Sequence, residues 1–343
     1  MTEQAAADLE RLDSGFRAAV AAAPREVVEA RLRLGGRAVT ATVAGRELAD
    51  LVLAPFAHLR DDADGEPPEL RIELWDAAAT GVPLDGALPA RGAEASGDGG
   101  VVVAADTTAL TAIDRGAGRI IGWRPSAAEL AVEERWRPLP AILPLWYLDR
   151  GIGVLHAAFV GRDGEGVLLV GPSGAGKSTT ALACATAGME MVGDDQVGLA
   201  EEDGAYRAHM LFGTARLWPE ALERDPWLAC GGAGERLPDG KLLVKPGPEA
   251  ALRHSGRVRG MAILRTDASH SRVTPARPGE ALLAIAPFSL LGVVGGGRWG
   301  MERIGVLVRS LPLRTVEVAG GPAEASALVE EAFEELRPKA GSG

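Results

Sequence analysis

The chain has 343 residues, of which 47% are hydrophobic and 24% charged, and its 47 acidic and 36 basic side chains give a net charge of −11. This is the composition of a globular protein with a sizeable core, and its acidic balance disfavours nucleic acid and anionic membrane surfaces as partners. The sequence has no apolar run of ~18–20 residues to span a bilayer, no secretory signal at its polar N-terminus, and only two cysteines. We therefore expect a cytoplasmic protein, and at this length two domains.

The first part of the sequence, residues 1–125, predicts a small α+β domain without a chemical motif, which we expect to serve acceptor binding or assembly. Residues 1–34 are rich in Ala and charged side chains and predict a helical or partly disordered lead. Near-helical spacing predicts a helix over residues 48–59, and the Gly- and Pro-rich residues 80–100 predict a loop. Apolar runs predict four short strands, at residues 38–43, 70–75, 101–105 and 119–123.

From Ser126 onward the pattern changes, and residues 126–343 predict an α/β domain. Ser126 and Glu129 have the spacing of a capping box, in which each side chain bonds the backbone amide of the other residue. Because a Gly-x-x-Gly turn joins the first two strands, we expect them to form a hairpin. The predicted elements are a helix at 145–150, strands at 153–160, 166–170, 261–264, 305–308 and 314–318, and a closing amphipathic helix at 322–336.

A glycine-rich motif in this domain carries specific chemistry. Residues 171–178 fit the phosphate-binding pattern G-x-x-x-x-G-K-[ST] at every position, after an apolar strand and before a predicted helix at 178–187. Glycines let successive backbone amides converge on phosphate oxygens, and the helix N-terminus adds partial positive charge. We expect ATP and Mg²⁺ as cofactors, with Lys177 at the β- and γ-phosphates and Ser178 on the metal. The predicted nucleotide-binding residues are Gly171, Pro172, Ser173, Gly174, Ala175, Gly176, Lys177, Ser178 and Thr179.

The loop predicts a ligand but no reaction, because P-loop folds host ATPases, GTPases, transporters and kinases. The sequence has no Asn/Thr-Lys-x-Asp motif for reading guanine and no Leu-Ser-Gly-Gly-Gln transporter signature. Both absences disfavour a GTPase and an ABC-type ATPase.

Two adjacent acids, Asp194 and Asp195, follow a short predicted strand over residues 189–193. A strand beside the loop strand would place both carboxylates at its C-terminal end, where open α/β sheets bind their ligands. One carboxylate can then bind Mg²⁺ while the other takes the proton of an attacking hydroxyl. The alternative is a solvated turn, which is the usual setting of an Asp-Asp pair.

His156 is the third candidate and ends the apolar run Gly-Ile-Gly-Val-Leu. A lone histidine on an apolar strand is usually a core residue. However, the tight turn of the predicted hairpin places the strand end that bears His156 opposite the end that bears Gly171. We therefore expect the imidazole to lie near the phosphates.

Together these features resemble the HPr kinase/phosphorylase family, whose P-loop domain is related to phosphoenolpyruvate carboxykinase. The resemblance rests on His156, the loop from Gly171, Gly188 and the run 192–195, and it covers residues 150–200. It implies a P-loop kinase domain of the HPr-kinase/PEP-carboxykinase type. It also implies a homo-oligomer.

The resemblance further implies a role for each candidate residue. Asp194 would be the general base on a substrate serine, with His156 in the active site. Lys177 would bind phosphate and Ser178 would bind Mg²⁺, with Asp195 beside Asp194 in the site. We further expect Asp195 to be the acid nearer the metal.

Two departures from the bifunctional enzymes separate this chain from them. Residues 212–219 lack a glycine-rich signature with an acidic metal ligand, and Thr179 stands where those enzymes commonly have an acid. The sequence is more similar to HPr-kinase-related proteins encoded beside genes for ribosomally made, modified peptides such as lasso peptides. Arg216 and Lys241 are candidates for phosphate or substrate contact, with ordinary surface cations as the alternative.

Three functions fit these observations. The first is an ATP-dependent kinase that phosphorylates a serine or threonine hydroxyl on a peptide or small protein. The second is a kinase of a small-molecule hydroxyl. The third is a nucleotide-binding regulator in which ATP only sets a conformation. The Asp-Asp pair favours the two kinases, because a switch needs no general base.

Overall fold

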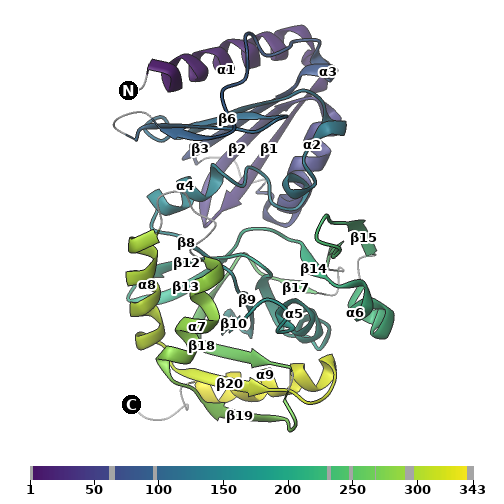
Figure 1. The fold of residues 1–343 in the computed structure, drawn as a ribbon, viewed down its shortest axis with the longest axis vertical. Coiled ribbons are helices and arrows are strands. Elements are labelled where there is room, and N and C mark those ends of the chain that lie inside the picture. The colour runs from purple at the N-terminus through teal and green to yellow at the C-terminus, as the bar shows by residue number, and fades with distance from the viewer. Residues whose placement is uncertain are drawn as a thin grey trace. The chain divides into compact units, whose positions relative to one another are not determined.

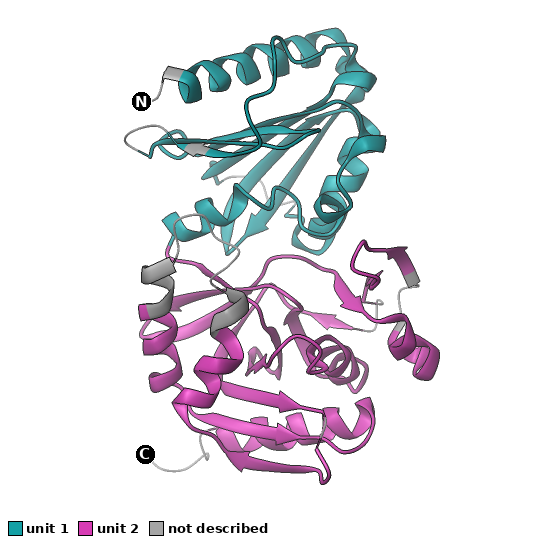
Figure 2. Cartoon of the chain, in the orientation of Figure 1, with its two compact units in different colours: residues 1–150 teal, residues 151–343 magenta. Residues whose placement is uncertain are grey.

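The computed structural model describes residues 3–61, 66–95, 99–229, 233–246, 250–266, 268–289 and 297–337. The chain divides into two compact units, residues 1–150 and residues 151–343 (Figure 2). Each is a mixed α/β structure (Figure 1). None of the helices in the described ranges combines enough length with enough apolar character to span a bilayer.

In the described part of the first unit, seven strands form one mixed sheet in the order β1-β2-β3-β7-β6-β5-β4. The parallel strands β2, β3 and β7 lie in its centre, and antiparallel pairs complete it at both sides. The strands are β1 (Val27–Leu34), β2 (Arg37–Ala44), β3 (Leu70–Asp76), β4 (Gly92–Ala95), β5 (Val101–Ala105), β6 (Leu110–Asp114) and β7 (Arg119–Arg124).

The prediction of a helical or disordered lead is wrong for residues 27–34, which form β1. Ala30, Leu32 and Leu34 are buried on alternate positions, the period of a half-buried strand. The predicted loop at 80–100 contains the short strand β4, and residues 96–98 lie outside the described residues.

Helices cover this sheet on both faces (Figure 1). Leu12 and Phe16 of α1 pack with Trp75 of β3 in one buried cluster. The helix predicted over residues 48–59 is α2 followed by a 3₁₀ helix over Ala54–Leu59. The α-helices of the unit are α1 (Glu3–Ala22), α2 (Arg46–Leu53), α3 (Ala77–Thr80) and α4 (Leu143–Asp149), with further 3₁₀ helices at Pro24–Glu26, Ala127–Glu129 and Val132–Arg135.

Of the two hydrogen bonds of the predicted capping box at Ser126, the one to the Ser126 side chain is present. The Ser126 hydroxyl accepts a hydrogen bond from the Glu129 amide at 3.3 Å. The element that it begins is one 3₁₀ turn, Ala127–Glu129, rather than a long helix.

Residues 126–150 group with the first compact unit, which extends beyond the predicted boundary after residue 125. The Ala127 amide donates to Asp76 Oδ2 at 2.7 Å, which ties this segment to the end of β3. Arg124 and Glu134 form a buried ion pair, with Nε to Oε2 at 2.8 Å. A buried charge pair is costly to separate, and both partners here lie before residue 151.

In the described part of the second unit, ten strands form one mixed sheet in the order β17-β11-β9-β10-β18-β13-β12-β8, with β20 beside β18 and β19 beside β20. The strands are β8 (Gly153–Leu155), β9 (Ala158–Arg162), β10 (Glu165–Val170), β11 (Glu190–Gly193), β12 (Val197–Glu202), β13 (Ala205–Met210), β17 (Ala251–Leu252), β18 (Ser255–Arg265), β19 (Arg272–Pro275) and β20 (Leu313–Glu317). A small sheet of order β14-β16-β15 comprises Ala215–Leu217, Leu242–Val244 and Ala233–Arg236.

The centre of the large sheet is β10, which pairs antiparallel with β9 and parallel with β18. Its apolar run 167–170 is fully buried, as expected of a strand covered on both faces. Residues of α5 and α9 share one core with it, including Cys184 and Phe333. The helices of the unit are α5 (Lys177–Thr186), α6 (Pro219–Arg224), α7 (Pro278–Ser289), α8 (Gly297–Ser310) and α9 (Pro322–Leu336), with a 3₁₀ helix at Pro226–Ala229.

The strand predicted at residues 305–308 is wrong, because this segment lies inside α8. Ile304, Leu307 and Val308 are buried while Val306 is 52% exposed, which is the spacing of one helix face. A run of four apolar residues fits the spacing of both a strand and a helix, so the flanking residues are needed to tell the two apart.

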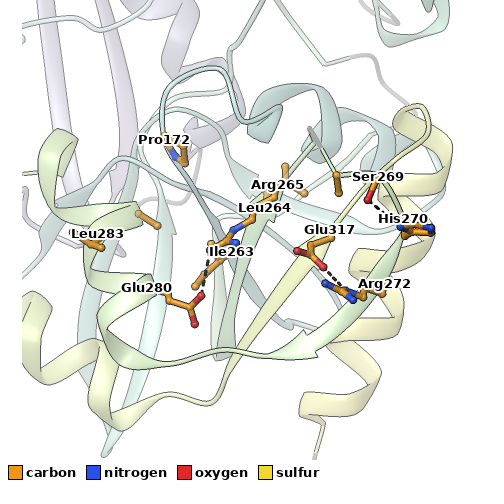
Figure 3. Close-up of a pocket in the computed structure, with 12 residues that line it drawn as sticks. Pro172, Ile263, Leu264, Arg265, Ser269, His270, Arg272, Glu280, Leu283 and Glu317 are labelled. Atoms are coloured by element: carbon orange, nitrogen blue, oxygen red, sulfur yellow. Dashed lines mark hydrogen bonds and ion pairs between the residues drawn. The ribbon is translucent and has the colours of Figure 1, made fainter.

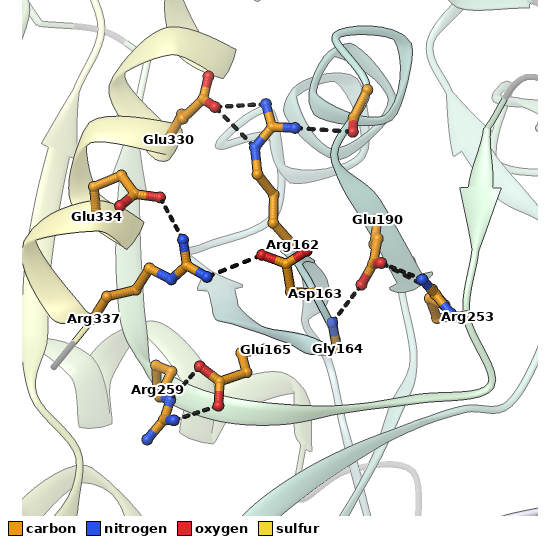
Figure 4. A network of polar contacts seen from close by, with 11 residues as sticks. Arg162, Asp163, Gly164, Glu165, Glu190, Arg253, Arg259, Glu330, Glu334 and Arg337 are labelled. Atoms are coloured by element: carbon orange, nitrogen blue, oxygen red, sulfur yellow. Dashed lines mark hydrogen bonds and ion pairs between the residues drawn. The ribbon is translucent and has the colours of Figure 1, made fainter. Parts of the chain in front are cut away.

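Ion pairs hold the β9–β10 hairpin at the end opposite the glycine-rich loop (Figure 4). Arg162 of β9 donates to Glu330 of α9, with Nε to Oε1 at 2.9 Å. In the turn, the Gly164 amide donates to Glu190 of β11 at 2.8 Å. The hairpin that leads into the loop is thereby tied to α9 and to β11.

Candidate functional site

The glycine-rich loop has the predicted setting between a buried strand and a helix. β10 ends at Val170, and α5 begins at Lys177. Gly174 and Gly176 have φ of 84° and 81°, in the left-handed region that side chains with a Cβ rarely adopt. At Gly176 a Cβ would also come within 3.0 Å of Thr266 Cγ2. Glycine is therefore required where the loop turns into the helix.

Lys177 is folded back over this loop. Its Nζ donates to the carbonyl oxygens of Gly171 at 2.9 Å and Pro172 at 3.1 Å, and the residue is only 7% exposed. Burial lowers the pKa of Lys177, while the nearby carboxylates of Asp194 and Asp195 act to raise it. A buried ammonium held by two neutral carbonyls is well placed to exchange them for anionic phosphate oxygens.

Asp194 is buried, with 3% exposure, just after β11. Its Oδ2 accepts the Arg216 amide at 3.3 Å, and no described residue forms a hydrogen bond with Oδ1. Burial, followed by the charge of Asp195, raises the pKa of Asp194 to about 6, although the neighbouring Ser178 hydroxyl acts to lower it. An orphaned carboxylate oxygen beside Ser178 is a site where a cation would be stabilised.

Asp195 points into different surroundings from its neighbour. It adopts φ of 63°, which is uncommon for a residue with a Cβ. Its Oδ2 accepts from Arg216 Nη1 at 3.1 Å, and its Oδ1 lies 3.4 Å from His156 Nδ1. The two adjacent carboxylates thus have different partners, the Arg216 amide for Asp194 and the Arg216 guanidinium for Asp195.

His156 lies near the Asp pair, but not on the predicted strand. Residues 153–160 are split into β8, which pairs with β12, and β9, which pairs with β10, and His156 occupies the break. Its Nδ1 donates to the Asp195 carbonyl oxygen at 2.9 Å, which assigns Nε2 as the acceptor of the neutral ring. Burial and the charge of Lys177 lower the pKa of His156, so the ring is neutral at pH 7.

A second wall of the site comes from the small sheet. Arg216 on β14 donates to both Asp195 and Asp239. Lys241 places its Nζ 5.5 Å from the ring centre of Trp218. Of these residues only Arg216 and Lys241 were candidates from the sequence, because the pairing of β14 with β16 is what brings the others beside the loop.

One cavity of about 400 Å³ joins these groups. Most of the predicted residues line it, namely His156, Ser173, Gly174, Gly176, Lys177, Ser178, Thr179 and Asp195, together with Arg216, Trp218 and Lys241. Four predicted residues do not line it: Gly171 and Pro172 accept from Lys177, Ala175 is buried, and Asp194 lies beneath the surface.

A larger cavity of about 730 Å³ lies beyond Pro172, between the ends of β18 and β20 and the start of α7 (Figure 3). Arg265 pairs with Glu280 at 3.2 Å, and Arg272 pairs with Glu317. The lining charges are thus matched within the cavity wall, so it offers less to a charged ligand than the loop cavity does.

The donor set fits a magnesium-bound triphosphate. Mg²⁺ prefers oxygen ligands and keeps several waters, so the Ser178 hydroxyl and the orphaned Asp194 oxygen suit it. The loop supplies backbone amides and a buried lysine for the phosphates. Within the described ranges, no cluster of three His, Cys, Asp or Glu side chains forms a metal site by itself.

The comparisons with known proteins match only parts of this chain. Residues 141–225 match the protein family described as "SynChlorMet cassette protein ScmC". No curated protein matches the sequence. Among solved structures the chain is similar to the HPr(Ser) kinase/phosphatase from Coxiella burnetii, at 15% identity and a TM-score of 0.28, over 52% of this chain and 95% of that chain. The family match contains His156, the loop and the Asp pair, and it ends before Lys241.

Proposed function

We propose that the chain is a Mg²⁺- and ATP-dependent kinase that transfers a phosphoryl group to a serine or threonine hydroxyl of a peptide or small protein. The observation that carries this proposal is the shared cavity, in which the loop residues Lys177 and Ser178 face His156 and Asp195. Phosphoryl transfer requires chiefly positioning and charge neutralisation, which this set of groups supplies.

We assign phosphate binding to the loop and metal binding and proton transfer to the Asp pair. Loop amides and Lys177 hold the phosphates, and Ser178 and Asp194 are the residues that would hold Mg²⁺. When bound, the metal neutralises charge that develops on the phosphate oxygens. The acceptor oxygen forms a bond to the γ-phosphorus while the bond to the β-phosphate oxygen breaks, and ADP leaves.

The geometry favours exchanged roles for the two acids relative to those that the resemblance implies. Asp195 lines the cavity, whereas Asp194 is buried beside Ser178. A base must come within hydrogen-bond reach of the proton that it accepts. We therefore assign the acceptor proton to Asp195 and the metal to Asp194.

His156 orients this base. Its hydrogen bond to the Asp195 carbonyl supports the residue in its left-handed conformation. Because the His156 ring is neutral, it does not form a charged ion pair with the Asp195 carboxylate, which stays available to accept the proton of the acceptor hydroxyl. Support for a peptide acceptor comes from the motif spacing, which resembles that of the HPr kinase family. The transfer assay below distinguishes a peptide acceptor from a small molecule.

The test is phosphate transfer from ATP by the full chain to serine- and threonine-containing peptides, to free serine, and without acceptor. Asp195→Asn keeps the shape of the side chain and removes the proton acceptor. Transfer should fall by about 10²-fold or more while ATP affinity stays within a few-fold. Asp194→Asn should instead raise the Mg²⁺ concentration that transfer requires.

Three results would contradict the proposal. Wild-type transfer rates in Asp195→Asn would remove its role as the base. ATP binding by the wild type without transfer to any alcohol would leave a nucleotide-binding regulator, and transfer to free serine alone would indicate a small-molecule kinase.

A further inference from the structure

Lysine is rare in this chain, since only four of the 36 basic residues are lysines. Two of the four, Lys177 and Lys241, line the same cavity. Lys245 is exposed, and Lys339 lies outside the described residues. The second lysine of the cavity, Lys241, lies directly before β16 of the small sheet, so it reaches the cavity from a different segment than the loop does.

A built turn holds Lys241 in place. Asp239 Oδ1 accepts the Lys241 amide at 3.2 Å, while Oδ2 of the same carboxylate accepts from Arg216. Between them, Gly240 has φ of 88°, and a Cβ there would lie 3.4 Å from the Trp218 ring. The turn is thereby fixed both to β14 and to the aromatic ring.

The ammonium of Lys241 has an aromatic support, while the nearby carboxylate of Asp239 is ion-paired with Arg216. It lies over the Trp218 ring, where the π face attracts a cation. Within the described ranges it forms no ion pair, since Asp239 pairs with Arg216 instead. Burial is the main reason why the pKa values of Lys177 and His156 are lowered, and the charge of Lys241 adds a smaller effect in the same direction, so its ammonium lies near both groups.

We propose that Lys241 is a catalytic residue that binds the terminal phosphate of the nucleoside triphosphate, on the side opposite Lys177. This inference rests on the proposed function, because it takes the loop as the site of the other phosphates. Loop amides bind the α- and β-phosphates and the loop lysine reaches the β- and γ-phosphates. A second cation on the wall beside Asp195 therefore meets the γ-phosphate next to the acceptor.

The test compares ATP, ADP and inorganic triphosphate, by calorimetry with Mg²⁺, on the full-length wild type, Lys241→Met, Lys241→Arg and Lys245→Met. Lys241→Met removes the charge and keeps the length of the side chain. ATP affinity should fall about 10-fold, as expected on loss of a charge-assisted contact, while ADP affinity changes less than two-fold. Lys241→Arg should retain most of the ATP affinity. Lys245→Met, the exposed control, should match the wild type.

The outcomes separate this proposal from the proposed function. Equal losses for ATP and ADP, or no loss for either, would overturn the role of Lys241. An ATP-specific loss in a protein that transfers phosphate to no alcohol would support Lys241 as a γ-phosphate ligand and overturn the kinase. A wild type that binds neither nucleotide nor triphosphate would overturn both.

Discussion

Asp194 and Asp195 are neighbours in the chain but have different chemistry because their surroundings differ. Asp194 is buried, and its Oδ1 has no hydrogen-bond partner among the described residues, so its charged form is poorly solvated. Asp195 has the Arg216 guanidinium and the His156 ring beside its carboxylate. A perturbed carboxylate such as Asp194 is typical of functional sites, since a structural core gains nothing from an orphaned charge.

Asp194→Asn should stabilise the ligand-free protein at neutral pH and lose this advantage in acid. Burial raises the pKa of Asp194 to about 6 in the folded state, above the ordinary 3.8. The folded state then binds the proton more tightly, so stability falls as pH rises from about 4 to 6. Above that range the buried charge of Asp194 lowers the free energy of unfolding of the wild type by up to about 3 kcal/mol. The neutral amide of Asp194→Asn does not have this effect. Denaturant unfolding without Mg²⁺ at about pH 4 and pH 8 measures the difference.

The matched control for that experiment is Asp203→Asn, which removes an exposed carboxylate from the turn between β12 and β13. It should change stability little at either pH. A gain in Asp194→Asn that is the same at both pH values would show that the buried charge is not its cause.

Elements with a strong local signal were predicted well. The closing helix predicted at 322–336 is confirmed as α9, and the strand, loop and helix around Lys177 occur in the predicted order. The predictions were wrong where a short apolar run fits the spacing of both a helix and a strand, as in α8, and where a strand follows a helix directly, as in β1. Such short runs are decided by tertiary packing.

The site was predictable in part, for the same reason. The loop is contiguous in sequence, so its phosphate-binding pattern can be identified without a fold. The predicted position of Asp194 and Asp195 beside the loop strand is off by one strand, because β9 lies between β10 and β11. The approach of Lys241 and Trp218 depends on β14 pairing with β16, which no local pattern indicates.

At the scale of the loop and its helix, Gly176→Ala should impair both stability and triphosphate binding. An alanine at φ of 81° costs about 1–2 kcal/mol, and its Cβ would press on Thr266. Gly188→Ala is the matched control, because φ is 84° at the other end of α5 and a Cβ there meets nothing within 4 Å. Both variants should lose stability through the positive φ, Gly176→Ala somewhat more because of Thr266, while only Gly176→Ala should bind inorganic triphosphate at least about 10-fold more weakly. Equal binding by the two variants would contradict the role of the loop.

At the scale of the whole molecule, each unit has a buried apolar cluster of its own, around Trp75 in the first and around Phe333 in the second. The residues of the proposed site lie after residue 150, from His156 to Lys241. A domain is expected to fold independently when its core and its hydrogen bonds lie within it. We therefore propose that the first unit serves acceptor binding or assembly rather than nucleotide binding.

Truncation should therefore distinguish the two boundaries. The fragment 151–343 should fold and bind Mg²⁺ and triphosphate within a few-fold of the full chain. The fragment 126–343 should be less soluble, because its first residues lose the Asp76 acceptor of Ala127 and leave Glu134 without Arg124. Circular dichroism, gel filtration and triphosphate calorimetry on both fragments make the measurement. If 126–343 is monomeric and binds while 151–343 is unfolded, residues 126–150 belong to the second unit and the boundary predicted from the sequence is the correct one.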